Sequence, residues 1–190
     1  MKKVLLMVAL ALTTLTMSAQ EDSKWTVKAG VGLSSVVGDD VEGVENIFSY
    51  KVGLSYDLGI SENFSIIPEV EFANKGYKSE VVNGDINKFF LQIPVFAAYK
   101  FNVSDNMKLA IKAGPYVAYG LLGSDIDWYN GGSDNIFDID ERFDAGIIAG
   151  LSLDFEQFTV GIEYNRGLTE VEEDCDAYNQ GFGVTFGYKF

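Results

Sequence analysis

Two glutamates are the first residues whose type and spacing could support chemistry. Glu69 and Glu71 lie two positions apart in a segment of alternating apolar and polar residues, so an extended strand would project both side chains from one face. Such a pair could act as a general acid and base, or line a narrow path for ions. Because any strand with one polar face has this spacing, we assign no catalytic residue from it.

A second candidate is the acidic segment DIDWYNGGSD at 125–134. Oxygen ligands at nearly alternate positions around a glycine turn suit Ca²⁺. The oxygen-bearing residues concerned are Asp125, Asp127, Asn130 and Asp134. Their spacing is one residue off the EF-hand pattern, so the segment is only a weak calcium candidate. We expect a solvated loop and no metal site.

Composition excludes several other kinds of site. The 190 residues include no histidine, which rules out a His-based triad, a His-ligated zinc and a His general base. The single cysteine, Cys175, cannot form an internal disulfide or a CxxC pair. A net charge of −14 argues against binding to nucleic acid. We therefore expect a protein that is not an enzyme, holds no cofactor and binds no nucleic acid.

The elements that must position these side chains are β-strands. Apolar and polar residues alternate with a period of two from Trp25 to the C-terminus, and no segment keeps a helical period. This pattern predicts eight strands, at about 25–34, 48–58, 64–75, 88–101, 107–121, 143–155, 158–167 and 178–190.

The lengths of these strands and of their connections indicate a membrane barrel. Many strands reach the ~9–11 residues that a tilted strand needs to cross a bilayer. Short connections at 61–63, 102–106 and 156–157 alternate with long ones at 35–46, 78–87, 122–142 and 169–177. Short periplasmic turns and longer outer loops are typical of outer-membrane barrels. We predict an all-β fold, an eight-stranded antiparallel up-and-down transmembrane β-barrel with acidic extracellular loops.

Aromatic residues on the apolar face support the same prediction. They gather at the two ends of the strands, as interfacial girdles do, whereas in a soluble sandwich they should be spread along the strands. Those beside the short turns and termini are Trp25, Tyr56, Phe64, Tyr99, Phe101, Phe155, Phe158, Tyr188 and Phe190. Those nearer the long loops are Phe48, Tyr50, Phe72, Phe89, Tyr119, Phe143 and Tyr178.

The opposite face carries charges of both signs among Gly, Ser and Thr. Its charged residues are Lys28, Lys51, Asp57, Glu69, Glu71, Lys75, Lys100, Lys108, Lys112, Asp144, Asp154, Glu163 and Lys189. An eight-stranded barrel is only just filled by its inner side chains, so inward charges must be paired or hydrated. We expect a plugged polar lumen. A small pore or transporter for solutes or ions is the alternative, and a secreted lipocalin-like carrier with its apolar face inside is less favoured.

Residues 1–19 have the pattern of a cleaved secretory signal peptide. Lys2 and Lys3 precede an apolar run from Val4 to Leu12, and cleavage after Ala19 is plausible. The apolar run is shorter than the ~20 residues of a spanning helix. We expect export, with residues 20–190 forming the barrel domain.

Three prolines lie at positions where a β-strand does not favour proline. Pro68, Pro94 and Pro115 lie inside predicted strands, where proline removes a ladder hydrogen bond. We expect bulges or locally unpaired backbone at these positions.

The chain resembles the outer membrane protein β-barrel domain family, in particular the PorT-like small barrels of Gram-negative bacteria. The segments that carry the likeness are FSIIPEVEFANKG at 64–76, FFLQIPVFAAYKF at 89–101, KLAIKAGPYVAYGLL at 108–122, FDAGIIAGLSLDF at 143–155 and GVTFGYKF at 183–190. The resemblance implies an integral protein of the cell outer membrane, in contact with its lipid. It offers no catalytic residue to carry over.

The C-terminus resembles an assembly signal. Phe190 ends the chain with Tyr188 on the same face, like the ending that the barrel-assembly machinery reads in the last strand of its clients. We expect these two residues to engage that machinery. The long acidic loops are candidates for contact with an unknown surface partner.

Overall fold

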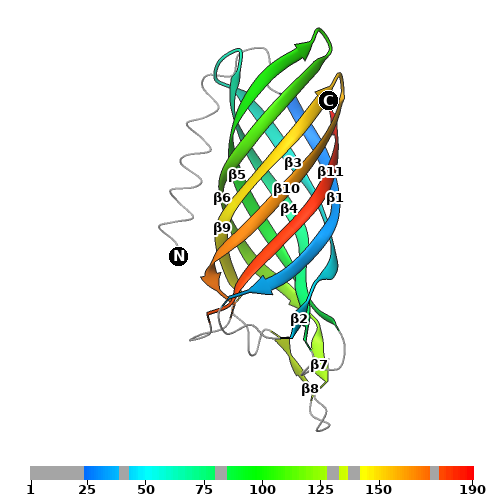
Figure 1. The fold of residues 1–190 in the computed structure, drawn as a ribbon, viewed down its shortest axis with the longest axis vertical. Helices are drawn as coiled ribbons and strands as arrows, with labels where there is room; N and C mark the ends of the chain where they lie inside the picture. The colour runs from blue at the N-terminus through cyan, green and yellow to red at the C-terminus, as the bar shows by residue number, and fades with distance from the viewer. Residues whose placement is uncertain (1–23, 39–42, 80–84, 128–132, 137–141, 172–175) are drawn as a thin grey trace.

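A computed structural model describes residues 24–38, 43–79, 85–127, 133–136, 142–171 and 176–190. The predicted signal peptide and the N-terminal residues up to 23 lie outside this set. Eight long strands form the wall of a barrel (Figure 1). They are β1 (Lys24–Val37), β3 (Ile47–Gly59), β4 (Phe64–Ser79), β5 (Asp85–Ser104), β6 (Met107–Gly123), β9 (Phe143–Phe155), β10 (Phe158–Glu170) and β11 (Tyr178–Lys189).

The barrel is closed and antiparallel throughout. Each strand pairs with the next long strand along the chain, and β1 pairs with β11, for example Val31 with Val184. Every backbone edge of the wall is therefore paired, as a bilayer requires. The eight-stranded up-and-down fold predicted from the alternating pattern is confirmed.

Three short strands lie at the long-loop end. They are β2 (Val44–Glu45), which pairs with the end of β4, and the two strands β7 (Asp125–Asp127) and β8 (Ser133–Asn135), which pair with each other. The other end has only short turns, and it also holds the start of β1 and the C-terminus (Figure 1).

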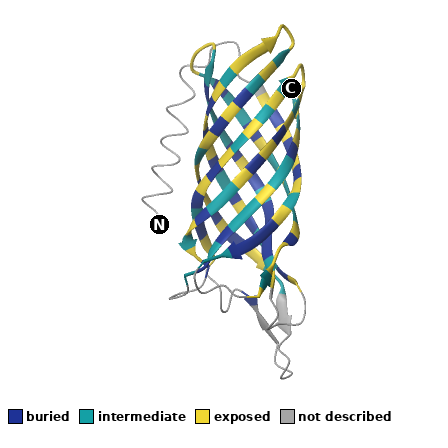
Figure 2. Ribbon diagram, in the orientation of Figure 1, coloured by how far each residue is buried: buried dark blue, intermediate teal, exposed yellow. Residues whose placement is uncertain are grey.

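The two faces of each strand have opposite chemistry. In β9, Ile147, Leu151 and Phe155 are exposed on the outside, whereas Asp144 and Ile148 are buried inside. Figure 2 shows this alternation around the wall. An outer band of Val, Leu, Ile and aromatic residues suits lipid, and β-branched and aromatic residues also favour strands. The apolar face points outward, so the lipocalin-like alternative is wrong.

Several strands extend beyond their predicted ends. The strands predicted at 64–75 and 88–101 span Phe64–Ser79 and Asp85–Ser104. The extension toward the long-loop end is polar on its outer face, with Lys78, Asp85 and Asn87, and its apolar Tyr77 and Ile86 are in phase with the inner face, so an apolar outer face gave no signal there. It is held by cross-strand pairing, including a hydrogen bond from Asn74 Nδ2 to Asn87 Oδ1 of 3.0 Å.

The three prolines interrupt the ladder without shifting its register. The β4–β5 pairing runs to Pro68 and resumes at Glu71, and the β5–β6 pairing stops at Pro94 and resumes at Ala97. The expected unpaired backbone is present. The expected bulges are absent from these sites, and the register shifts lie elsewhere, for example between Phe89 and Phe90. A missing N–H removes a bond but adds no residue, so the two strands stay in step.

Among the described residues, no helix is long and apolar enough to cross a membrane.

Candidate functional site in the barrel lumen

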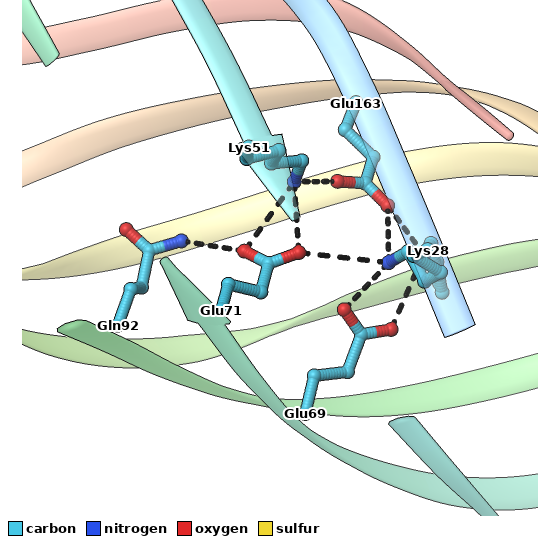
Figure 3. Close-up of polar contacts among 7 residues, drawn as sticks. Lys28, Lys51, Glu69, Glu71, Gln92 and Glu163 are labelled. Atoms are coloured by element: carbon cyan, nitrogen blue, oxygen red, sulfur yellow. Dashed lines mark hydrogen bonds and ion pairs between the residues drawn. The ribbon is translucent and has the colours of Figure 1, made fainter. Parts of the chain in front are cut away.

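Six charged side chains from five strands meet in the middle of the barrel. We call them the lumen cluster: Lys28 of β1, Lys51 of β3, Glu69 and Glu71 of β4, Lys112 of β6 and Glu163 of β10. Figure 3 labels all of them except Lys112, together with Gln92 of β5. Their side chains are at most 7% exposed, except that of Lys51 at 20%.

Glu163 is the centre of the lumen cluster. Its Oε1 accepts hydrogen bonds from Lys112 Nζ at 2.5 Å and from Lys28 Nζ at 3.1 Å. Its Oε2 accepts one from Lys51 Nζ on the other side. One carboxylate thus joins lysines from three strands that are not all neighbours in the wall.

The two glutamates of β4 complete the cluster. Glu69 Oε2 accepts a hydrogen bond from Lys28 Nζ at 2.5 Å, and Glu71 Oε1 lies 3.1 Å from Lys51 Nζ. Gln92 Nε2 donates to Glu71 Oε2 at 3.0 Å. Three lysines therefore face three glutamates, and the charges cancel within the cluster. That balance matters because a buried charge without a partner is strongly destabilising.

Glycines make room for these long side chains. A Cβ at Gly150 would lie 2.6 Å from the Ile162 carbonyl oxygen and 2.9 Å from Glu163 Cγ. A Cβ at Gly53 would lie 2.9 Å from Glu71 Cγ. Gly150 pairs across the wall with both Glu163 and Lys112, so two charged side chains lie against it. The glycines of the inner face are thus a steric requirement of a narrow, charged lumen.

A second polar group lies nearer the long loops. Lys75 Nζ donates a hydrogen bond to Asp144 Oδ2 at 2.7 Å. The same Nζ lies 4.3 Å from the centre of the Tyr116 ring. Tyr116 Oη also donates to Asp144 Oδ2 at 3.2 Å. The Phe90 and Tyr116 rings that Lys75 faces belong to a buried apolar group; it consists of Ile86, Phe90, Phe96, Tyr116, Ala118, Ile136 and Ile148.

A third polar group lies at the short-turn end. Lys100 pairs with Asp57, and Lys189 Nζ lies 2.6 Å from Asp154 Oδ2. These four residues also line a polar basin of about 280 Å³ at the short-turn mouth. Lys108, predicted on the inner face, is exposed at the rim of this basin.

The structure places the predicted site residues as follows. Glu69 and Glu71 share a face as predicted, and lysines hold both of them. Asp125, Asp127 and Asp134 fall on β7 and β8, and Asn130 lies outside the described residues. In the described part of the chain, no group of three or more Asp, Glu or Cys residues could hold a metal ion. Tyr188, near the short-turn end of β11, and Phe190, which follows that strand, are both exposed.

Sequence reasoning missed the aromatic part of the inner face. Phe90, Phe96 and Tyr116 are at most 2% exposed, and Lys112 Nζ lies 4.4 Å from the centre of the Phe96 ring. Gln92 and the buried Lys88 were missed too. The sequence did contain a signal for them in β5. Residues 88 to 100 form one continuous strand, so every even-numbered residue in it faces the same side as the inward Lys100.

Solved structures with this fold include two outer-membrane barrels. The outer membrane enzyme PagL is 16% identical with a TM-score of 0.58, over 86% of this chain and 98% of that chain. Neisserial surface protein A (NspA) is 14% identical with a TM-score of 0.55, over 90% of this chain and 100% of that chain. At such identities these likenesses show the fold alone. No curated protein matches the sequence significantly.

The family comparison is decisive for class and location. The family model described as outer membrane protein beta-barrel domain matches residues 4–190, which is nearly the whole chain. Together with the closed barrel, its outer apolar band and its charged interior, this match places the protein in the outer membrane. The chain belongs to the outer membrane protein beta-barrel domain family.

Proposed function

We propose that this protein is a non-enzymatic outer-membrane barrel whose lumen is closed to ions and solutes and whose long acidic loops contact a partner outside the cell. The observation that carries the proposal is the lumen cluster. Its six side chains neutralise one another across the middle of the barrel, so a passing ion would have to displace several buried ion pairs at once. Within the family, the PorT-like resemblance stays a prediction.

The loops are the surface most available to a partner. The described wall has a lipid-facing apolar band outside and buried, paired charges inside, which leaves the two ends for a partner. Acidic residues of the long connections, most of them outside the described set, include Asp39, Asp40, Glu42, Asp138, Asp140, Glu141, Glu172, Glu173 and Asp174. Their charge favours a basic partner or one bridged by cations.

Two measurements test this proposal. Liposomes containing the purified protein should take up glucose no faster than protein-free liposomes in an osmotic swelling assay. An epitope tag inserted after Gly132 should be labelled by antibody on intact cells, whereas a tag inserted after Asp105, in a short turn, should be labelled only after lysis. Rapid glucose entry would contradict the closed lumen, and the reverse labelling pattern would contradict the orientation.

A further inference from the structure

Arg166 is a charged side chain in the lipid-facing band of the wall. It lies on β10 in the outward phase, opposite to the phase of the inward Glu163. Its outward neighbours along the strand, Tyr164 and Leu168, are 45% and 64% exposed, so the apolar band continues on both sides of it. A cation on the lipid side of a barrel is unfavourable, by an amount that rises with its depth, and an anion beside it offsets that cost.

The surroundings of Arg166 leave its hydrogen-bond donors open to a ligand. The guanidinium carbon lies 5.4 Å from the centre of the Tyr178 ring. Stacking on a ring occupies one face of a guanidinium and leaves the N–H groups at its edge. In the described part of the chain, this guanidinium forms no ion pair with a carboxylate. Glu170 and Asp176, the acidic residues at the ends of the two strands, lie farther toward the long loops.

Gln180 of β11 places a second donor beside Arg166. The two residues are cross-strand partners. Tyr164 Oη donates a hydrogen bond to Gln180 Oε1 at 3.3 Å, so the oxygen end of the amide is occupied and its N–H groups remain as donors. An arginine fork with an amide N–H beside it is a donor set that suits the oxygens of a phosphate.

An apolar groove lies on the outer wall next to this donor pair. It has a volume of about 290 Å³ and spans β6, β9, β10 and β11, which are neighbours in the wall (Figure 1). The groove is deepest in side-chain size at Ala113 and Ala149, which pair across β6 and β9, and the longer Leu151 and Ile162 line it beside them. Because the groove lies in the apolar outer band, lipid is the medium that faces it.

The groove and the donor pair are continuous. Tyr164 and Phe182 pair with each other across β10 and β11, and both line the groove. Tyr164 is the outward residue before Arg166, and Phe182 is the outward residue after Gln180. One ligand can therefore touch both features, with an anionic head toward the long loops and an apolar tail toward the middle of the wall.

We propose that this surface binds a membrane lipid with a phosphate headgroup. Arg166 and Gln180 hold the phosphate at the depth of Tyr178, where the aromatic girdle meets the headgroups, and the groove holds an acyl chain. The orientation proposed above places this lipid in the outer leaflet, so the choice of leaflet rests on that proposal. A phosphate ion would use only the donors, and an uncharged lipid would use only the groove.

Native mass spectrometry of the purified barrel in an uncharged detergent tests the site. The probe is dimyristoyl phosphatidic acid, which should bind in a saturable manner. Dimyristoylglycerol has the same chains without the phosphate, and inorganic phosphate has no chains, so each should bind about tenfold more weakly or worse. Equal affinity for phosphatidic acid and dimyristoylglycerol, or for phosphatidic acid and inorganic phosphate, would overturn the proposal.

The two arginines of the chain, Arg142 and Arg166, provide a matched pair of variants. R166Q removes the cation from the site, and the affinity for phosphatidic acid should fall about tenfold or more, since hydrogen bonds to a charged group contribute that much. R142Q makes the same change at an exposed arginine outside the site and should bind like the wild type. Wild-type affinity in R166Q, or an equal loss in R142Q, would overturn the proposal.

A second pair of variants tests the groove. A149L fills it with a side chain that lipid tolerates, so the affinity for phosphatidic acid should fall severalfold. A29L is the control, because it makes the same change on the exposed outer face of β1, away from the groove. Wild-type affinity in A149L, or an equal loss in A29L, would overturn the proposal.

Heat-modifiable migration on cold gels shows that each variant is a closed barrel. If R166Q does not fold, A149L and the comparison of the two lipids decide the question. Failure of lipid binding would leave the closed lumen and the loop contacts intact, because Arg166, Gln180 and the groove lie on the outer wall. The two proposals can therefore fail separately.

Discussion

At the scale of single residues, the interior of this barrel depends on charge compensation. The buried lysines Lys28, Lys75 and Lys112 each have a carboxylate partner in the lumen. Removing one partner leaves the other charge uncompensated, whereas removing both leaves a neutral, polar interior. The stability of the barrel should therefore depend on pairs rather than on individual residues.

The Lys75–Asp144 pair tests this dependence. K75M leaves the buried Asp144 carboxylate without its ammonium partner and should lower the free energy of unfolding by about 3–5 kcal/mol. The double variant K75M/D144N should recover most of that loss, because a neutral amide then replaces the carboxylate. Urea titrations of the purified barrels measure both effects. A double variant no more stable than K75M would contradict charge compensation.

Glycine at the lumen cluster makes a second residue-scale prediction. G150A places a methyl group against the Ile162 carbonyl oxygen and Glu163 Cγ, and should cost about 1–3 kcal/mol through overpacking. S152A is the control, because Ser152 is the next inward residue of β9 and already has a Cβ. It should be nearly neutral. Equal stability of the two variants would show that the glycine has no steric role.

At the scale of elements, alternation in the sequence was sufficient to predict every strand of the wall. The lipid requires an apolar outer face along the whole strand, so the period-2 signal is unbroken in segments such as 143–155. The same signal fails where strands extend beyond the bilayer. The predicted end of β4 is therefore too early, and the predicted start of β5 is too late. There the outer face is polar and the apolar Ile86 lies on the inner face, so a pattern of outward apolar residues does not mark the strand.

Cross-strand partners were beyond the reach of the sequence. Nothing in local patterning says that Glu163 meets Lys28, 135 positions away, because that contact depends on register and barrel closure together. The inward Phe90, Phe96 and Tyr116 were missed for another reason. The inner face was searched for charged residues only, so these three aromatic residues were placed on neither face, although the phase of Phe90 and Phe96 relative to Lys100 places these two inside.

The C-terminal strand carries an element-scale prediction. Phe190 N donates to the Trp25 carbonyl oxygen at 2.9 Å, and Tyr188 pairs with Val27, so both residues help to close the barrel where β11 meets β1. Y188A/F190A should leave export intact and reduce the amount of assembled protein in the outer membrane, with degradation in the periplasm.

The control for that prediction is F101A. It removes an exposed aromatic residue from the same end of the barrel, on β5, and touches neither Tyr188 nor Phe190. Quantitative blots of membrane fractions, with heat-modifiable migration as the sign of closure, measure the outcome. Normal assembly of Y188A/F190A, or an equal defect in F101A, would show that the ending is only part of the aromatic girdle.

At the scale of the whole molecule, the barrel joins a lipid-facing surface to an interior divided into layers. Ion pairs at the short-turn end, the lumen cluster in the middle and the apolar group with Lys75 and Asp144 toward the long loops follow one another along the axis. Small cavities of about 40 and 50 Å³ lie between these layers. We therefore expect a barrel that spans the outer membrane without opening it.

Single-channel recording in planar bilayers tests this central claim most directly. The purified, heat-modifiable barrel should insert without producing stable conductance steps in potassium chloride at either polarity, because ions cannot pass the paired charges of the lumen cluster. A porin reconstituted in parallel serves as the positive control for insertion and recording. Reproducible openings of porin size from this protein would contradict the closed lumen and assign the protein to the pores.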